Sequence, residues 1–229
     1  MENIKLAVFD VAGTTAKDEG LVVKAFVSAA ISQGVECNSE RMNAMVRYVE
    51  ETMGQRKMDV FLHLFDNNQV IAEAAHNRFV TAYLELVANG ELEEFSGITD
   101  FFKVLRAQNI GIAITTGFPR EILDLIIKSL KWTDLIDVSV AASEVKNGRP
   151  APDMIFRSME LFGAKSGLEL TPNEIAVIGD TVSDVQSGIS AQAKYVVGIN
   201  SGTHPSSSLT AAGATHVLTA ATQLLTHVH

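Results

Sequence analysis

Asp10 is the first residue in the chain whose type and context could do chemistry. It follows a short apolar run at residues 4–9 and precedes Gly-Thr-Thr at residues 13–15. The run has the length and composition of a buried strand, and the glycine and hydroxyl residues after it are typical of a tight turn. A carboxylate held in such a turn at the end of a strand can act as a nucleophile that accepts a phosphoryl group. Asp10 is therefore our candidate nucleophile.

Three later segments carry further reactive residues after predicted strands. Residues 115–117, Thr-Thr-Gly, follow the apolar run at 110–114, and their hydroxyl and backbone amide groups can hold phosphate oxygens. Arg149 offers a cation in a loop stiffened by prolines, just ahead of a predicted helix. Asp180 and Asp184 follow another apolar run, and we expect their i, i+4 spacing to place both carboxylates on one face of a helix's first turn.

Asp10, Asp180 and Asp184 together suit a hard, octahedral cation. Mg²⁺ binds carboxylates, backbone carbonyls, waters and phosphate oxygens, and it offsets the repulsion between an anionic nucleophile and an anionic substrate. Each of the four segments taken alone is common as an ordinary turn, loop or helix start. Their joint occurrence at the ends of predicted strands in one chain favours a single site. We therefore predict a Mg²⁺ cofactor.

The elements that must position these residues alternate along most of the chain. We expect strands at 4–9, 110–114, 138–141, 175–178, 195–197 and 216–218, helices at 121–130, 154–162 and 184–191, and a closing helix through Leu224 and Leu225. Such alternation predicts a doubly wound, Rossmann-like α/β fold, with a parallel sheet and helices on both faces. In these folds ligands bind at the carboxyl ends of the strands, where the four segments lie.

Residues 21–89 differ from the rest because their apolar residues repeat with helical spacing only. This segment follows the carboxyl end of the first strand, so an all-helical insert there would cover the predicted site as a lid. We expect a core domain made of residues 1–16 and 93–229, and an α-helical cap domain made of residues 17–92.

The composition limits the partners of the protein. The 18 Lys and Arg against 27 Asp and Glu give a net charge of −9, which disfavours nucleic acid and anionic membranes. The single cysteine excludes an internal disulfide and favours a reducing compartment. Charged residues interrupt the first apolar run, unlike the core of a signal peptide, and no run has the length of a membrane span. We expect a cytoplasmic protein with a small anionic substrate, and a homodimer is left open.

The four segments, in this order, resemble the four motifs of the haloacid dehalogenase superfamily. The resemblance covers residues 10–184. Within that superfamily, Phe-Asp-x-Ala-Gly-Thr-Thr, Thr-Thr-Gly, Gly-Arg-Pro and Gly-Asp-Thr-Val-Ser-Asp are similar to the motifs of phosphonatases, which hydrolyse phosphonoacetaldehyde, and the arginine at position 149 adds to this match. The resemblance implies a core with an inserted helical cap, a Mg²⁺ cofactor and an aspartyl-phosphate intermediate.

The resemblance also implies roles for individual residues. Asp10 would be the nucleophile and a metal ligand, together with the backbone carbonyl of Ala12 and the carboxylate of Asp180, while Asp184 would be a further ligand or would orient one. The phosphoryl oxygens would be held by Thr116, Gly117 and the catalytic Arg149, with Thr115 an ambiguous neighbour.

Ala12 stands where aspartate phosphatases of the superfamily carry a second carboxylate, which protonates the departing alkoxide and then activates water. Cleavage of a carbon–phosphorus bond instead needs an electron sink, which an imine formed by a lysine can supply. Residues 53–59, Met-Gly-Gln-Arg-Lys-Met-Asp, match the cap segment that carries this lysine in phosphonatases. The match makes Lys57 the candidate Schiff-base lysine, and the missing acid is consistent with it.

Other positions depart from the phosphonatase pattern. Val60 replaces a histidine, Phe118 a tyrosine and Leu21 a cysteine, and His63 is expected to be an ordinary cap histidine. The leading function is hydrolysis of phosphonoacetaldehyde or a close phosphonate. The alternatives are a phosphatase of a small phosphate ester and, less favoured, a non-catalytic phosphate-binding module. A mutase is disfavoured because returning phosphate to a sugar also needs the acid that position 12 lacks.

Overall fold

The computed structural model describes residues 3–17, 20–201 and 203–227. Its main sheet has six strands in the order β5-β4-β1-β6-β7-β8, and all neighbours pair in parallel. The strands are β1 (Leu6–Phe9), β4 (Gly111–Thr116), β5 (Val138–Ala141), β6 (Ile175–Gly179), β7 (Tyr195–Ile199) and β8 (His216–Leu218). The predicted parallel α/β fold is therefore confirmed.

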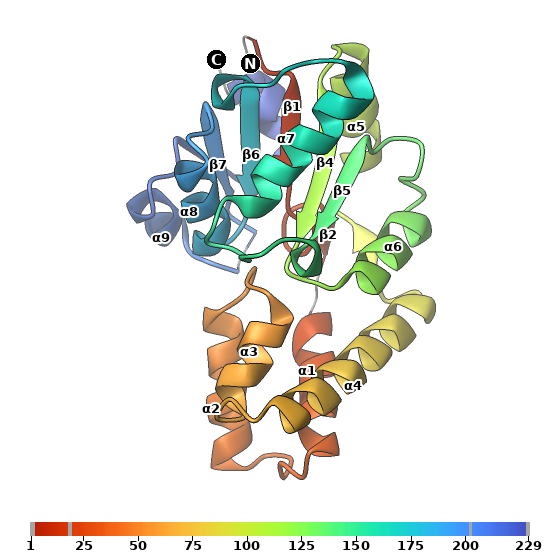
Figure 1. Ribbon diagram of the computed structural model, residues 1–229, viewed down its shortest axis with the longest axis vertical. Helices are drawn as coiled ribbons and strands as arrows, with labels where there is room; N and C mark the ends of the chain where they lie inside the picture. The colour runs from red at the N-terminus through yellow and green to blue at the C-terminus, as the bar shows by residue number, and fades with distance from the viewer. Residues whose placement is uncertain (1–2, 18–19, 202, 228–229) are drawn as a thin grey trace.

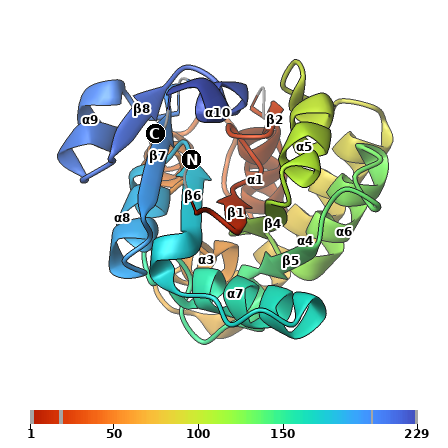
Figure 2. The same ribbon diagram turned by 90° about the horizontal axis from the view of Figure 1, so that it is seen from above.

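Helices cover both faces of the sheet (Figure 2). One face carries α7 (Asp153–Ser166), α8 (Val182–Ser190) and α9 (Ser206–Ala211), and the other carries α5 (Ile98–Ala107), α6 (Arg120–Ser129) and α10 (Leu224–His227). Successive β1 side chains divide between the two layers, as the pleat requires. Leu6 and Val8 share a buried cluster with Phe162 of α7, whereas the ring of Phe9 lies 5.3 Å from that of Phe102 of α5.

A second group of helices stands beyond the carboxyl ends of the strands (Figure 1). It consists of α1 (Leu21–Ser32), α2 (Glu40–Glu51), α3 (Lys57–Leu64) and α4 (Gln69–Ala88), which we call the helical segment. Aromatic rings fill its interior, where the ring centroid of Phe61 lies 5.6 Å from that of Phe26 and 5.7 Å from that of Phe79. These helices follow the periodicity of the sequence. The predicted domain boundary at residue 17 adjoins residues 18–19, which lie outside the described residues.

The chain crosses between the sheet and the helical segment twice, and the two crossings pair with each other. The short strands β2 (Ala16–Lys17) and β3 (Glu93–Glu94) are antiparallel, and the Lys17 ammonium lies 2.8 Å from the Glu93 carboxylate. This ribbon ties the start and the end of the insertion together. None of the described helices is both long enough and apolar enough to cross a bilayer.

Candidate active site

The predicted reactive residues gather at the carboxyl edge of the sheet. Asp10 follows β1, Thr116 ends β4, Arg149 lies in the loop between β5 and α7, and Asp180 follows β6. Because these parallel strands are neighbours, their ends bring together residues that are far apart in the sequence. A cavity of about 40 Å³ lies between this edge and the helical segment, and it is lined by Asp10, Ala12, Val22, Met53, Gly54, Lys57, Thr116, Gly117, Phe118, Asp180, Thr181 and Thr203.

The turn after β1 fixes the position of Asp10. The backbone amide of Asp10 donates to the carbonyl of Ile178 at 2.9 Å, and the Thr15 hydroxyl donates to the carbonyl of Asp10 at 2.9 Å. The backbone amides of Thr15 and Ala16 both donate to the carbonyl of Val11 at 2.9 Å. The turn is thus closed by its own hydrogen bonds, which leave the Asp10 carboxylate facing the cavity.

Gly13 lets this turn approach Asp180. Its φ is +83°, and a Cβ on this residue would lie 2.1 Å from Oδ2 of Asp180. We predict that Gly13→Ala lowers the free energy of unfolding by about 3 kcal/mol, because a side chain here adds a clash to left-handed backbone strain. Gly34→Ala is the matched control, since Gly34 has a φ of +82° and no neighbour within 4 Å. It should cost about 1 kcal/mol in urea unfolding, and equal losses for the two variants would refute the close approach.

Three buried carboxylates meet one buried cation. One carboxylate oxygen each from Asp10, Asp180 and Asp184 all lie within 4.8 Å of one another. Nη1 of Arg149 is 2.5 Å from Oδ1 of Asp10 and 2.9 Å from Oδ1 of Asp184. Burial raises the pKa of Asp10 to about 7, against the opposing charge of Arg149, and also holds the pKa of Asp180 well above its usual range. When all three carboxylates are ionised, they carry more negative charge than Arg149 can balance, and repulsion between them adds to the raised pKa values.

The surplus charge and one unpaired oxygen fit a divalent cation. Oδ1 of Asp180 accepts a hydrogen bond from the Thr14 hydroxyl at 2.9 Å, whereas its buried Oδ2 has no hydrogen-bond partner among the described residues. A buried carboxylate oxygen is costly unless a donor or a metal satisfies it. Asp10, Asp180 and Asp184 could hold such a cation, and Ala12 lies beside them in the cavity wall.

Asp184 reaches the cluster by a different route from the one that its spacing predicts. Helix α8 begins at Val182, so Asp180 precedes the helix and the two carboxylates do not share a helical face. Asp184 instead forms a capping box with Thr181, whose backbone amide and hydroxyl donate to Oδ2 of Asp184 at 3.0 and 2.5 Å. This cap turns Oδ1 of Asp184 toward Arg149.

The predicted phosphate-binding residues divide into two sets. Thr116 and Gly117 line the cavity. Thr115 does not line it. The Thr115 hydroxyl accepts a hydrogen bond from Nη2 of Arg149 at 2.5 Å and so helps to position the guanidinium. Gly117 also lies against the helical segment, because a Cβ there would be 2.3 Å from the carbonyl oxygen of Gln55.

Lys57 is buried in the same cavity, although it is the first residue of α3 in a polar stretch of sequence. Its side chain is among the buried polar groups, with the residue 6% exposed. Its backbone amide donates to the carbonyl of Gly117 at 3.2 Å, and Nζ lies 5.6 Å from the ring centroid of Phe118. The structure thus places an amine and the Asp10 carboxylate in the walls of one small cavity.

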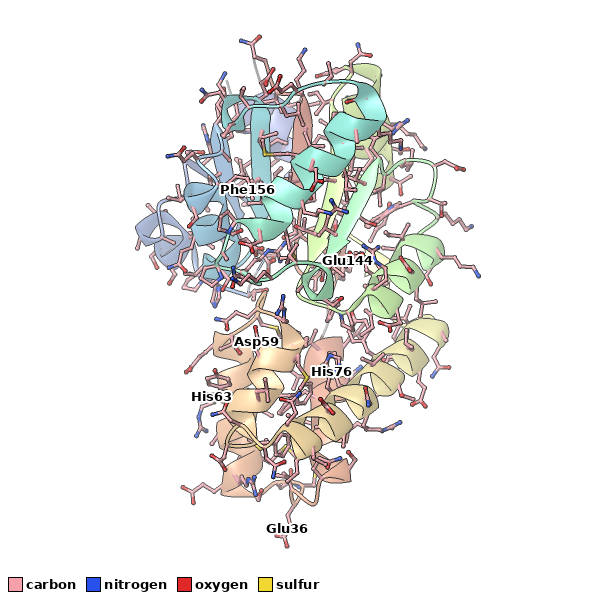
Figure 3. All side chains as sticks on the ribbon, in the orientation of Figure 1. Glu36, Asp59, His63, His76, Glu144 and Phe156 are labelled. Atoms are coloured by element: carbon pink, nitrogen blue, oxygen red, sulfur yellow. The ribbon has the colours of Figure 1, made fainter. Side chains whose placement is uncertain are left out.

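Of the residues that depart from the phosphonatase pattern, Phe118 lines the cavity, whereas Val60 and Leu21 do not. Phe118 is buried and its ring lies 4.7 Å from that of Tyr83, while Val60 is buried in the interior of the helical segment. His63 is exposed and stacks on Tyr48 at 4.2 Å, on the outer edge of the helical segment (Figure 3). His63 therefore does not replace the missing histidine.

Several residues of the site were not predicted from the sequence. Thr14 and Thr181 orient Asp180 and Asp184, and Val22 lines the cavity. The Thr181 hydroxyl had a local signal, since a threonine three residues before an acidic residue at a helix start is typical of a capping box. Val22 had none, because an apolar residue on a helix face looks the same whether it lines a cavity or fills a core.

Comparisons with known proteins agree with this geometry. The sequence profile of the haloacid dehalogenase-like hydrolases matches residues 7–197. Phosphonoacetaldehyde hydrolase of Bacteroides fragilis is 25% identical over 202 residues, covering 84% of this chain and 74% of that protein. A phosphorylated carbohydrates phosphatase of Thermotoga maritima is 24% identical over 212 residues, covering 92% of each chain.

Solved structures share the fold. A hydrolase from Pseudomonas syringae superposes with a TM-score of 0.81 at 22% identity, covering 98% of this chain and 97% of the other. A phosphonoacetaldehyde hydrolase-like protein from Oleispira antarctica gives 0.80 at 20% identity, covering 98% and 91%. With the family profile spanning the motifs around Asp10 and Asp180, the chain belongs to the haloacid dehalogenase-like hydrolases.

Proposed function

We propose that this enzyme hydrolyses the carbon–phosphorus bond of phosphonoacetaldehyde, or of a close aldehyde-bearing phosphonate, through an aspartyl-phosphate intermediate on Asp10. The observation that carries the proposal is the burial of Lys57 in the same cavity as Asp10, where position 12 offers no acid. Relatives named phosphonoacetaldehyde hydrolase support it.

In the proposed reaction the Lys57 amine condenses with the aldehyde, and water leaves as a protonated imine forms. Asp10 then attacks phosphorus, the carbon–phosphorus bond breaks, and its electron pair enters the imine to give an enamine. Protonation of the enamine carbon and hydrolysis of the resulting imine release acetaldehyde and free Lys57. Water hydrolyses the aspartyl phosphate, which releases phosphate and restores Asp10.

The remaining residues hold the phosphoryl group and exclude water. Arg149 is held beside Asp10 by Asp10, Asp184 and Thr115, where its guanidinium can bind a phosphoryl oxygen, and Thr116 and Gly117 line the cavity that Asp10 also lines. A Mg²⁺ ion held by Asp10, the carbonyl of Ala12 and Asp180 would neutralise charge on the transferring group.

The apolar part of the cavity fits a substrate with few carbons. Val22, Met53 and Phe118 supply this wall, and the cavity of about 40 Å³ is far smaller than the pockets that hold larger ligands. An apolar, closed surrounding also protects an imine from premature hydrolysis. We propose that the helical segment acts as the cap that provides it.

A phosphatase of a small phosphate ester is the second candidate. Val60 and Phe118 leave the aldehyde side without two polar groups that phosphonatases carry, and one relative is named as a phosphorylated carbohydrates phosphatase. Measuring phosphate release with Mg²⁺ from phosphonoacetaldehyde and from a panel of small phosphate esters decides between the two. We expect the phosphonate to have the highest kcat/KM, and preference for an ester would overturn the proposal.

The substitution Ala12→Asp distinguishes the two functions by whether the variant gains ester hydrolysis. An ester phosphatase that lacks its acid should recover about 10²–10⁴-fold with a carboxylate at this position. We instead expect slower hydrolysis of phosphonoacetaldehyde, because the imine mechanism needs no acid at this position. The gain in ester hydrolysis should then be less than ~10-fold. Ala12→Asn is the control for size without acidity. A gain of about 10²-fold or more on esters for Ala12→Asp alone would contradict the proposal.

A further inference from the structure

Arg56, next to Lys57, crosses from the helical segment to the sheet domain. Its guanidinium meets the turn that follows β5: Nε and Nη2 donate to the carbonyl of Ala142 at 3.0 and 2.6 Å. Nη2 also donates to the carbonyl of Lys146 at 3.2 Å and to that of Val145. One side chain of the helical segment thus binds three backbone carbonyls of the opposite loop.

The backbones are in close contact around this side chain. A Cβ on Gly148 would lie 3.0 Å from Cβ of Arg56, and the Lys57 amide donates to the carbonyl of Gly117 at 3.2 Å. The approach is close enough that side chains at Gly117 and Gly148 would meet the segment. Arg56 therefore acts at the point where the segment touches two loops of the sheet.

Both loops lead into the candidate active site. The loop bound by Arg56 continues directly to Arg149, whose guanidinium contacts Asp10. Arg56 itself precedes Lys57, the first residue of α3. A guanidinium has five donors in a rigid planar fork, so one side chain can fix several carbonyls in a single arrangement. Arg56 therefore links the position of the Lys57 amine to the position of the Arg149 guanidinium.

We propose that Arg56 is a positioning residue that latches the helical segment onto the sheet domain in the closed state and so aligns Lys57 with Arg149 and Asp10. The latch as a structural device is independent of the substrate, whereas its effect on carbon–phosphorus cleavage rests on the proposed function.

The closed state can be measured without activity. Cys37 is exposed in the turn between α1 and α2 and is the single cysteine of the chain, and Ser207 is exposed on α9. Nitroxide labels on Cys37 and on Ser207→Cys report the distance between the helical segment and the sheet domain by pulsed electron spin resonance. Arg56→Ala should broaden the distance distribution and shift it to longer values. Arg47→Ala, which removes an exposed arginine from α2, should leave it unchanged.

Kinetics test the alignment. Arg56→Ala should lower kcat/KM for phosphonoacetaldehyde by about 10²-fold, as expected for a misplaced catalytic group, and mainly through kcat. Arg56→Lys should fall between the wild type and Arg56→Ala, because an ammonium retains the charge without the planar fork. It also serves if Arg56→Ala fails to fold.

The outcomes separate the latch from the proposed function. A broadened distance distribution for the Arg56 variants supports the latch even if the wild type prefers a phosphate ester. A distribution identical to that of the wild type in both Arg56→Ala and Arg56→Lys overturns the latch, whatever the substrate. An active wild type whose kcat/KM is unchanged by both substitutions overturns the alignment role.

Discussion

Asp10→Asn is expected to abolish phosphate release from every substrate, by about 10⁴-fold or more, because the amide cannot accept the phosphoryl group. Both candidate enzymatic functions require this nucleophile. The measurement is phosphate release under saturating Mg²⁺, with phosphonoacetaldehyde and with the best phosphate ester. Phosphate release at the wild-type rate would remove Asp10 from the reaction and refute the assigned site.

The same variant should remain folded, so that its inactivity has a chemical cause. Burial raises the pKa of Asp10 from its ordinary value to about 7, which means that the folded state binds this proton more tightly than the unfolded chain. The metal-free protein therefore loses stability through Asp10 as the pH rises from about 4 to 7. Asp10→Asn removes that loss, so at pH 8 without metal it should unfold at a urea concentration no lower than that of the wild type.

Lys57→Arg is expected to eliminate carbon–phosphorus cleavage, by about 10⁴-fold or more, because a guanidinium keeps the charge but forms no imine with the aldehyde. The measurement is single-turnover phosphate release from phosphonoacetaldehyde. Lys24→Arg makes the same change at an exposed position of α1 and should be silent. Retained phosphonate hydrolysis by Lys57→Arg would leave Asp10 in place but would exclude the imine mechanism.

Most of the fold follows from local patterns in the sequence. The buried strands β1, β6 and β7 are continuous apolar runs, and β4 is one up to Thr115, which is typical of a parallel sheet covered on both faces. Helix α5 was not predicted, although Ile98, Phe101, Phe102 and Leu105 have helical spacing and are buried. The ribbon of β2 and β3 had no local signal, because two-residue strands are set by pairing between distant segments.

The residues of the candidate site could be predicted where a sequence motif marks the end of a strand and the turn after it. Asp10, Thr116, Arg149 and Asp180 lie at the ends of strands or in the loops that follow them at one edge, so parallel topology alone brings them together. The burial of Lys57 was not predictable from its polar neighbours, since it depends on where the helical segment meets the loop at Gly117. The same holds for the hydrogen bonds of Arg56, whose acceptors are backbone carbonyls about ninety residues later in the chain.

Borohydride reduction can trap the imine that we propose Lys57 forms with the substrate. Incubation of the wild type with phosphonoacetaldehyde and borohydride should stop activity and add the mass of a reduced adduct to the peptide that contains Lys57. Borohydride without substrate, and the same treatment of Lys57→Arg, should leave the corresponding peptide unmodified. An unmodified Lys57 peptide in wild-type protein that hydrolyses the phosphonate would exclude an imine at Lys57.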